Sequence, residues 1–160
     1  MTARQYLRQI ERCLEEIKAR DRKLEELRDE MNLSGVQGIR YDKDKVQTSL
    51  TNTFEERFIK YLEKSEKLRI EALEEREEYI RLKGQIEKEI ESLIDLRYVK
   101  ILRRKYVYIW SYRQICDELN YDYDYARSLN SDAVDAFYEK FKDVHNFEPE
   151  KKKTSHTNTQ

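Results

Sequence analysis

Residues that interrupt helices are almost absent from this chain. Its 160 residues include only 3 Gly and 1 Pro, and helix-favouring Glu, Lys, Arg and Leu fill much of the rest. Because 41% of the residues are charged and the mean hydropathy is −1.02, too few apolar side chains are available for one large core. The sequence therefore predicts an all-α protein whose long helices bury narrow apolar seams.

A heptad pattern runs through about residues 2–33. Its seam positions alternate four and three residues apart: Tyr6, Ile10, Cys13, Ile17, Arg20, Leu24, Leu27 and Met31. The one polar seam residue, Arg20, costs stability but can fix the register or the partner of the helix. Gly35 and Gly38 are expected to end this helix, because Gly tolerates the left-handed turn at a helix C-terminus.

A second long helix is expected over about residues 54–92, after a polar loop at 34–53 and a cap at Asn52 or Thr53. Its heptad is interrupted by three polar residues, Ser65, Glu75 and Glu89. Two long helices joined by a loop pack as an antiparallel hairpin, here residues 1–93, and their seams can also serve a second subunit. The sequence does not decide between these uses.

The heptad pattern ends at about residue 94, where aromatic residues become frequent and the expected helices become shorter. We expect a compact domain at 94–144 with helices at 95–106, 111–119 and 123–142. Residues 145–160 are polar and are expected to form a disordered tail, with His145 and His156 in solvent.

Residues 111–137 have the pattern of a helix-turn-helix. Ser111 and Gln114 form a capping-box pair, Asn120 can adopt a positive φ in the turn, and Asp122 can cap the next helix. The apolar stripe of that helix is Ala126, Leu129, Ala133, Val134 and Phe137, and the preceding helix supplies a third wall from Val99, Leu102, Tyr106 and Val107. The fold prediction is thus a long antiparallel helical hairpin followed by a small three-helix helix-turn-helix domain.

Such a motif makes double-stranded DNA the candidate partner. The formal net charge is −1, so any affinity for DNA must come from local patches. Groups suited to base edges or phosphates lie on the second helix and on the basic segments before it: Tyr123, Tyr125, Arg127, Ser128, Asn130 and Ser131, with Arg103, Arg104, Lys105 and Arg113. The alternative is that these residues only solvate short helices.

Acidic residues between 117 and 139 oppose DNA binding, since phosphate repels them. They also motivate an alternative function, a protein-interaction adaptor or polymerase-binding modulator without direct DNA recognition.

The sequence contains no signature of catalysis, and an enzyme is not expected. A Gly-rich phosphate loop, a metal-ligand cluster and a nucleophile–base pair are all missing, so neither a cofactor nor a metal is expected. Cys13 and Cys116 lie at apolar helical positions and are expected to pack as small hydrophobic residues. Without a membrane-length apolar run or a signal-peptide pattern, we expect a cytoplasmic protein.

Residues 98–141 resemble the region-four helix-turn-helix of sigma factors, with Tyr98-Val-Lys-Ile-Leu-Arg-Arg-Lys-Tyr106 leading into Ser111-Tyr-Arg-Gln-Ile115. Over residues 1–144 the chain is similar to phage late-transcription regulators of the RinA and ArpU type, through Thr2-Ala-Arg-Gln-Tyr-Leu7 and Val46-Gln-Thr-Ser49 as well. The resemblance implies a phage- or prophage-encoded, DNA-binding activator of late genes that acts with host RNA polymerase in the bacterial cytoplasm and self-associates through its long helices.

The resemblance maps recognition onto Tyr123, Asp124, Arg127, Ser128 and Ser131. This chain departs from the family at Asp122 and Asp124, where relatives tend to carry basic or neutral residues. The Val46–Ser49 segment either binds a nucleic-acid phosphate or docks its loop on the hairpin, and the sequence leaves both open.

Overall fold

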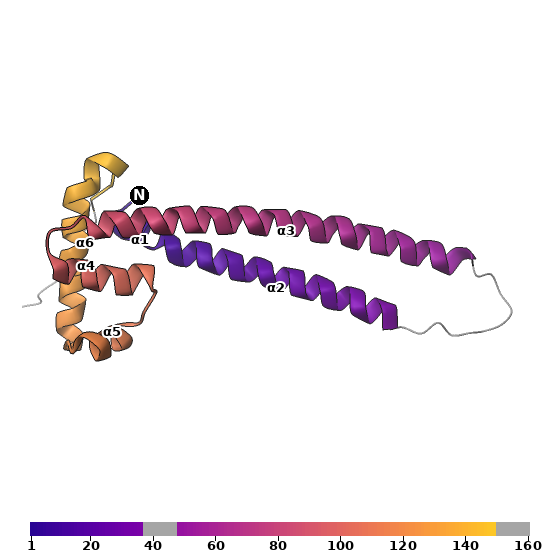
Figure 1. Cartoon of the computed structure of the whole chain (residues 1–160), viewed down its shortest axis with the longest axis horizontal. Coiled ribbons are helices and arrows are strands. Elements are labelled where there is room, and N and C mark those ends of the chain that lie inside the picture. The colour runs from indigo at the N-terminus through magenta and orange to yellow at the C-terminus, as the bar shows by residue number, and fades with distance from the viewer. Residues whose placement is uncertain (37–47, 150–160) are drawn as a thin grey trace, which may run out of the picture. The chain divides into compact units, whose positions relative to one another are not determined.

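A computed structural model of the chain describes the backbone of residues 1–36 and 48–149 and the side chains of 1–32 and 55–149. Within these ranges every regular element is a helix and no strand is present, so the all-α prediction is confirmed (Figure 1). The helices are α1 (Ala3–Leu7), α2 (Gln9–Val36), α3 (Thr48–Glu91), α4 (Leu96–Leu102), the π-helix η1 (Arg103–Val107), α5 (Tyr112–Leu119) and α6 (Tyr123–His145).

The chain divides into two compact units. Unit 1 contains Met1–Arg12 and Arg81–Gln160, and unit 2 contains Cys13–Ile80. The unit that holds the short helices α4, α5 and α6 therefore also holds the N-terminal residues and the last turns of α3. Each unit is described by itself.

In unit 2, α2 and α3 lie side by side along their lengths (Figure 1). Ile17, Leu27 and Ala72 are buried, as their heptad positions predict. The polar seam residues meet as well, because Arg20 forms ion pairs with Glu75 and, at 2.7 Å, with Glu71. A charge placed at a seam position of α2 thus finds its counter-charge on α3, which is how a polar seam residue sets register.

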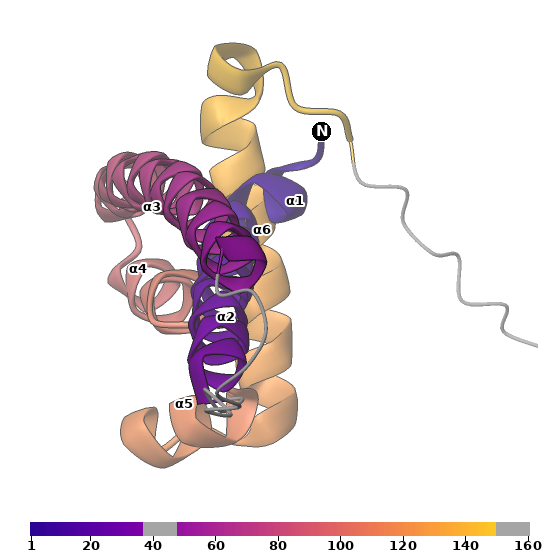
Figure 2. The same ribbon diagram turned by 90° about the vertical axis from the view of Figure 1, so that its right-hand side faces the viewer.

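The core of unit 1 is built around α6. The helices α1, α4 and α5 each pack against it (Figure 2), and the predicted stripe from Ala126 to Phe137 is buried. Of the third wall, Leu102, Tyr106 and Val107 are buried, while Val99 is half-buried. The N-terminal segment completes the core, since Tyr6 lies against Phe137 with ring centroids 6.2 Å apart.

The local signals around α5 and α6 are confirmed in detail. The Ser111 side chain accepts a hydrogen bond from the Gln114 backbone N–H, and the Ser111 backbone N–H donates one to Gln114 Oε1. Asn120 ends α5 at a φ of 51°, in the left-handed region, and Asp122 caps α6 by accepting a hydrogen bond from the Asp124 N–H. These caps fix where the two helices begin and end.

The bounds of the long helices differ from the prediction. The first expected helix is divided at Arg8, whose ψ of −5° departs from regular helical values, into α1, which begins with a Thr2–Gln5 capping box, and α2. Because α2 continues to Val36 and α3 begins at Thr48, Asn52 and Thr53 lie inside α3 and do not cap it. Helix propagation is cooperative, so a long helix readily extends into polar flanks. Residues 37–47, with Val46 and Gln47, lie outside the described residues.

Helix α6 ends at His145, three residues beyond the predicted end at residue 142. His145 was expected in solvent, but its ring stacks on Phe147 and its Nε2 lies 3.0 Å from Glu89 Oε1. Phe147 is buried, and the Glu148 backbone N–H donates to the Met1 carbonyl. Residues 145–148 are therefore part of the packed unit, because an aromatic cluster from both chain ends holds them.

Candidate nucleic-acid interface

The first turns of α6 present most of the predicted recognition residues at the surface. Arg127, Ser128 and Ser131 are exposed, and so are both tyrosines, Tyr123 and Tyr125. Since Asp122 caps the helix and the Ala126–Leu129 side packs inward, the rotation of α6 about its axis is fixed. These side chains are thus held in place by a rigid helix.

Asn130 does not belong with them. Its side chain is only 1% exposed, and its Nδ2 donates a 3.3 Å hydrogen bond to the Tyr106 hydroxyl inside the unit. The prediction that Asn130 contacts DNA bases is therefore corrected to a structural role. It lies one position beyond Leu129 on the buried side of α6, where a polar residue must find a partner.

The basic run before the motif is mostly engaged within the protein. Arg103 forms ion pairs with Glu87 at 2.8 Å and Glu91 at 3.1 Å, and Arg104 forms one with Glu118 at 3.5 Å. Lys105 donates to the Trp110 carbonyl. The sequence shows these cations without acids among them, but the fold supplies acids from α3 and α5. Arg103 and Arg104 have correspondingly less free charge to offer phosphate.

Arg113 behaves differently from those three residues. Its side chain is exposed on the first turn of α5. It therefore remains available to a ligand at the surface.

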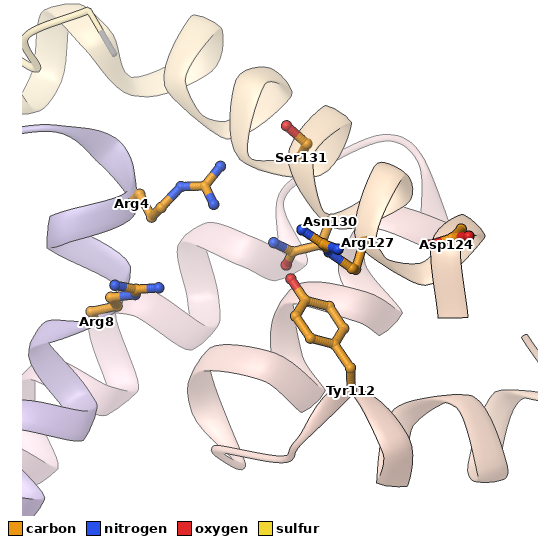
Figure 3. A pocket seen from close by; sticks show the side chains of 7 residues that line it. All are labelled: Arg4, Arg8, Tyr112, Asp124, Arg127, Asn130 and Ser131. Carbon is orange, nitrogen blue, oxygen red and sulfur yellow. The ribbon is translucent and has the colours of Figure 1, made fainter. Parts of the chain in front are cut away.

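A polar pocket of about 510 Å³ lies beside α6 in unit 1 (Figure 3). Arg4 and Arg8 form one side of it, and α6 and Tyr112 form the other. The complete lining is Arg4, Arg8, Tyr112, Asp124, Arg127, Asn130 and Ser131. Three arginines against one aspartate leave the lining with a net positive charge, in a chain whose total charge is −1.

Sequence reasoning missed the contribution of Arg4, Arg8 and Tyr112 to this site. Arg4 and Arg8 lie outside the predicted seam of the first helix, and nothing in the linear pattern connects them with α6. Their spacing of four residues, which places them on one face, was the only available signal. The packing of Tyr6 and Leu7 against the core of unit 1 is what brings them to the pocket.

The electrostatics around Tyr112 reflect the same convergence. Burial raises the pKa of the Tyr112 phenol, as does the charge of Tyr106, while Arg4 and Arg127 act in the opposite direction. The hydroxyl is therefore protonated at neutral pH and can donate a hydrogen bond. Arg127 also lies over the Tyr123 ring, 5.9 Å from its centroid, and this contact restrains its side chain.

An acidic stripe accompanies this basic pocket. Asp124 and Asp135 are exposed four residues before Ser128 and four residues after Ser131, so all four residues share one face of α6. Asp132 is exposed beside them. Positive charge in this part of unit 1 is thus concentrated on the flank of α6 that carries Arg127, and not along its outermost line.

Other kinds of site find little support in the described ranges. No group of three or more metal-ligating side chains occurs there, and both cysteines are free thiols. None of the helices described is at once long enough and apolar enough to cross a membrane.

Comparison of the chain with known protein families, with curated proteins and with solved structures found no match. The resemblance to phage regulators therefore stays a prediction.

Proposed function

We propose that this protein is a DNA-binding transcription regulator, built as a long antiparallel helical hairpin followed by a three-helix helix-turn-helix domain. In this proposal α5 and α6 are the two helices of the motif, and the first turns of α6 approach the DNA. The resemblance to phage late-transcription activators suggests that host RNA polymerase is a second partner and that the long helices mediate self-association.

One observation carries the proposal. Exposed Arg127, Ser128 and Ser131 on a rigid, capped helix lie beside a pocket to which Arg4 and Arg8 also contribute. Arginine forks and hydroxyl groups are the donors that proteins use for phosphates and base edges. The acidic residues on the outermost line of α6 favour an approach through the Arg127 flank, because Asp124 and Asp135 repel phosphate.

Binding can be tested by fluorescence anisotropy with a labelled duplex in about 50 mM salt, where phosphate contacts are strongest. A duplex selected by the protein from a random library then serves as the specific probe. Arg127→Ala should reduce the preference for this duplex over a scrambled one by about 1–3 kcal/mol. Arg113→Gln should weaken both duplexes to a similar extent. If the wild-type chain retains no duplex at low salt, the proposal is wrong.

A second candidate function is that of a protein-interaction adaptor. The exposed acids of α6 favour it, since Asp124, Asp132 and Asp135 would suit a basic protein surface. Recovery of a defined partner such as polymerase from nuclease-treated host lysate would support it, and Asp124→Asn with Asp135→Asn should reduce that recovery. Loss of the partner on nuclease treatment alone would count against it.

A further inference from the structure

We propose that Arg4, Arg8 and Arg127 form a binding pocket for a backbone phosphate of DNA, so that the N-terminal segment, residues 1–12, is part of the nucleic-acid interface. The inference rests on the proposed function and adds a named site, and its ligand chemistry, to it. It assigns a role to arginines that lie far from the helix-turn-helix in sequence.

The pocket is preorganised by the core beneath it. Tyr6 and Leu7 are buried between the two arginines of the N-terminal segment, and Tyr6 packs on Phe137 of α6. A second contact holds the N-terminal segment in place, because the Met1 ammonium forms a 3.2 Å ion pair with Glu148, which follows α6. Arg4 on α1 and Arg8 at its C-cap are therefore held close to α6, and little ordering is required when an anion binds.

The donors around the pocket suit a phosphate. Each guanidinium offers a planar fork of N–H groups that matches two phosphate oxygens. The protonated Tyr112 hydroxyl and the Ser131 hydroxyl lie in the same lining and can donate to a third oxygen. Arg8 is an exposed residue of this lining, so its guanidinium is accessible to an anion there.

A phosphate in a polymer fits this pocket better than an enclosed small molecule. Arg8, Asp124 and Ser131 are exposed lining residues, so the pocket opens on the same surface as Ser128 and Arg127. Asp124 lies at the opposite end from Arg4 and Arg8 (Figure 3). The anion is therefore expected between the arginines, on the side of the pocket away from the carboxylate.

The test compares wild type with Arg8→Gln, Arg8→Lys and the control Arg28→Gln, which removes the same charge from an exposed position of α2 in unit 2. Duplex affinity is measured by anisotropy over a range of salt concentrations. Arg8→Gln should raise Kd about tenfold and lower the slope of log K against log salt by about 0.9, the value of one phosphate contact. Arg8→Lys should restore the slope but only part of the affinity, since a lysine lacks the fork.

Arg28→Gln should match wild type, and urea unfolding followed by Trp110 fluorescence should show that every variant is folded. If Arg8→Gln binds the duplex with wild-type affinity and slope, the pocket proposal is overturned while the proposed function survives. If wild type itself binds no duplex, the proposed function fails and the inference fails with it.

A second experiment distinguishes a DNA phosphate from a free phosphate compound as the ligand of the pocket. Modification of Arg4, Arg8 and Arg127 by phenylglyoxal is mapped by mass spectrometry with duplex DNA or with inorganic phosphate present. Protection by duplex at concentrations near its Kd supports the proposal. Protection by inorganic phosphate but not by duplex would overturn it in favour of a small phosphorylated ligand.

Discussion

Phe137 joins the N-terminal segment to α6, so Phe137→Ala tests how unit 1 is held together. The side chain is fully buried, and its ring centroid lies 6.2 Å from that of Tyr6 and 4.7 Å from that of Phe141. A buried phenylalanine removes about 200 Å² from water, which at about 25 cal/mol/Å² corresponds to roughly 5 kcal/mol. Alanine retains part of this, and the cavity adds a cost, so we expect a loss of about 3–5 kcal/mol.

The assay uses the one tryptophan of the chain, Trp110, which lies in unit 1. Urea unfolding followed by its fluorescence reports on that unit, whereas circular dichroism reports on all helices together. The matched control is Val144→Ala on the same helix, since Val144 is 68% exposed and its loss should change stability by less than about 0.5 kcal/mol. A loss of less than about 1 kcal/mol in Phe137→Ala would refute the packing argument.

If that loss leaves too little folded protein for measurement, Phe137→Leu provides the milder step. It keeps most of the apolar volume but removes the ring contacts with Tyr6, and we expect a smaller loss than for alanine. Because the same contact positions Arg4 and Arg8, duplex affinity should fall in Phe137→Leu even where the protein remains folded. Unchanged affinity would show that the N-terminal segment is held by other contacts.

Three further predictions concern the local signals of unit 1. Ser111→Ala removes the cap of α5 and should lower the free energy of unfolding in urea by about 1 kcal/mol. Ser128→Ala, at an exposed position of α6, should leave it almost unchanged. Asn120→Val should cost about 1–2 kcal/mol, because a β-branched residue resists the left-handed φ of 51°, while Asn120→Gly should stay close to wild type. Burial, together with the charges of neighbouring aspartates, raises the pKa of the Cys116 thiol. Its thiolate fraction at a given pH is therefore below that of a free cysteine. Alkylation of Cys116 by iodoacetamide, mapped by mass spectrometry, should reach half its maximal rate at a higher pH than alkylation of free cysteine.

Local features of unit 1 were predictable because short-range chemistry decides them. The scarcity of Gly and Pro determined the helical class, and the Ser111–Gln114 pair, Asn120 and Asp122 determined where α5 and α6 begin and end. Each of these signals acts within a few residues of itself, through a backbone N–H or a φ angle. The buried stripe of α6 followed from its spacing alone.

The bounds of the long helices were less predictable from the same sequence. The polar residues around Thr48 predict a loop, but α3 begins there. Polar side chains are as compatible with an exposed helix as with a turn. Propagation from the packed part of the helix decides between the two.

Which residues meet was decided only by tertiary structure. Arg103 and Arg104 stand in a run without acids, but Glu87, Glu91 and Glu118 reach them from α3 and α5. The opposite holds for Arg8, which lies outside the predicted seam of its helix and lines a basic pocket together with Arg127. Charge in a sequence is a property of neighbours along the chain, whereas the field that a ligand meets depends on neighbours in space, and in this protein the two differ most at the candidate site.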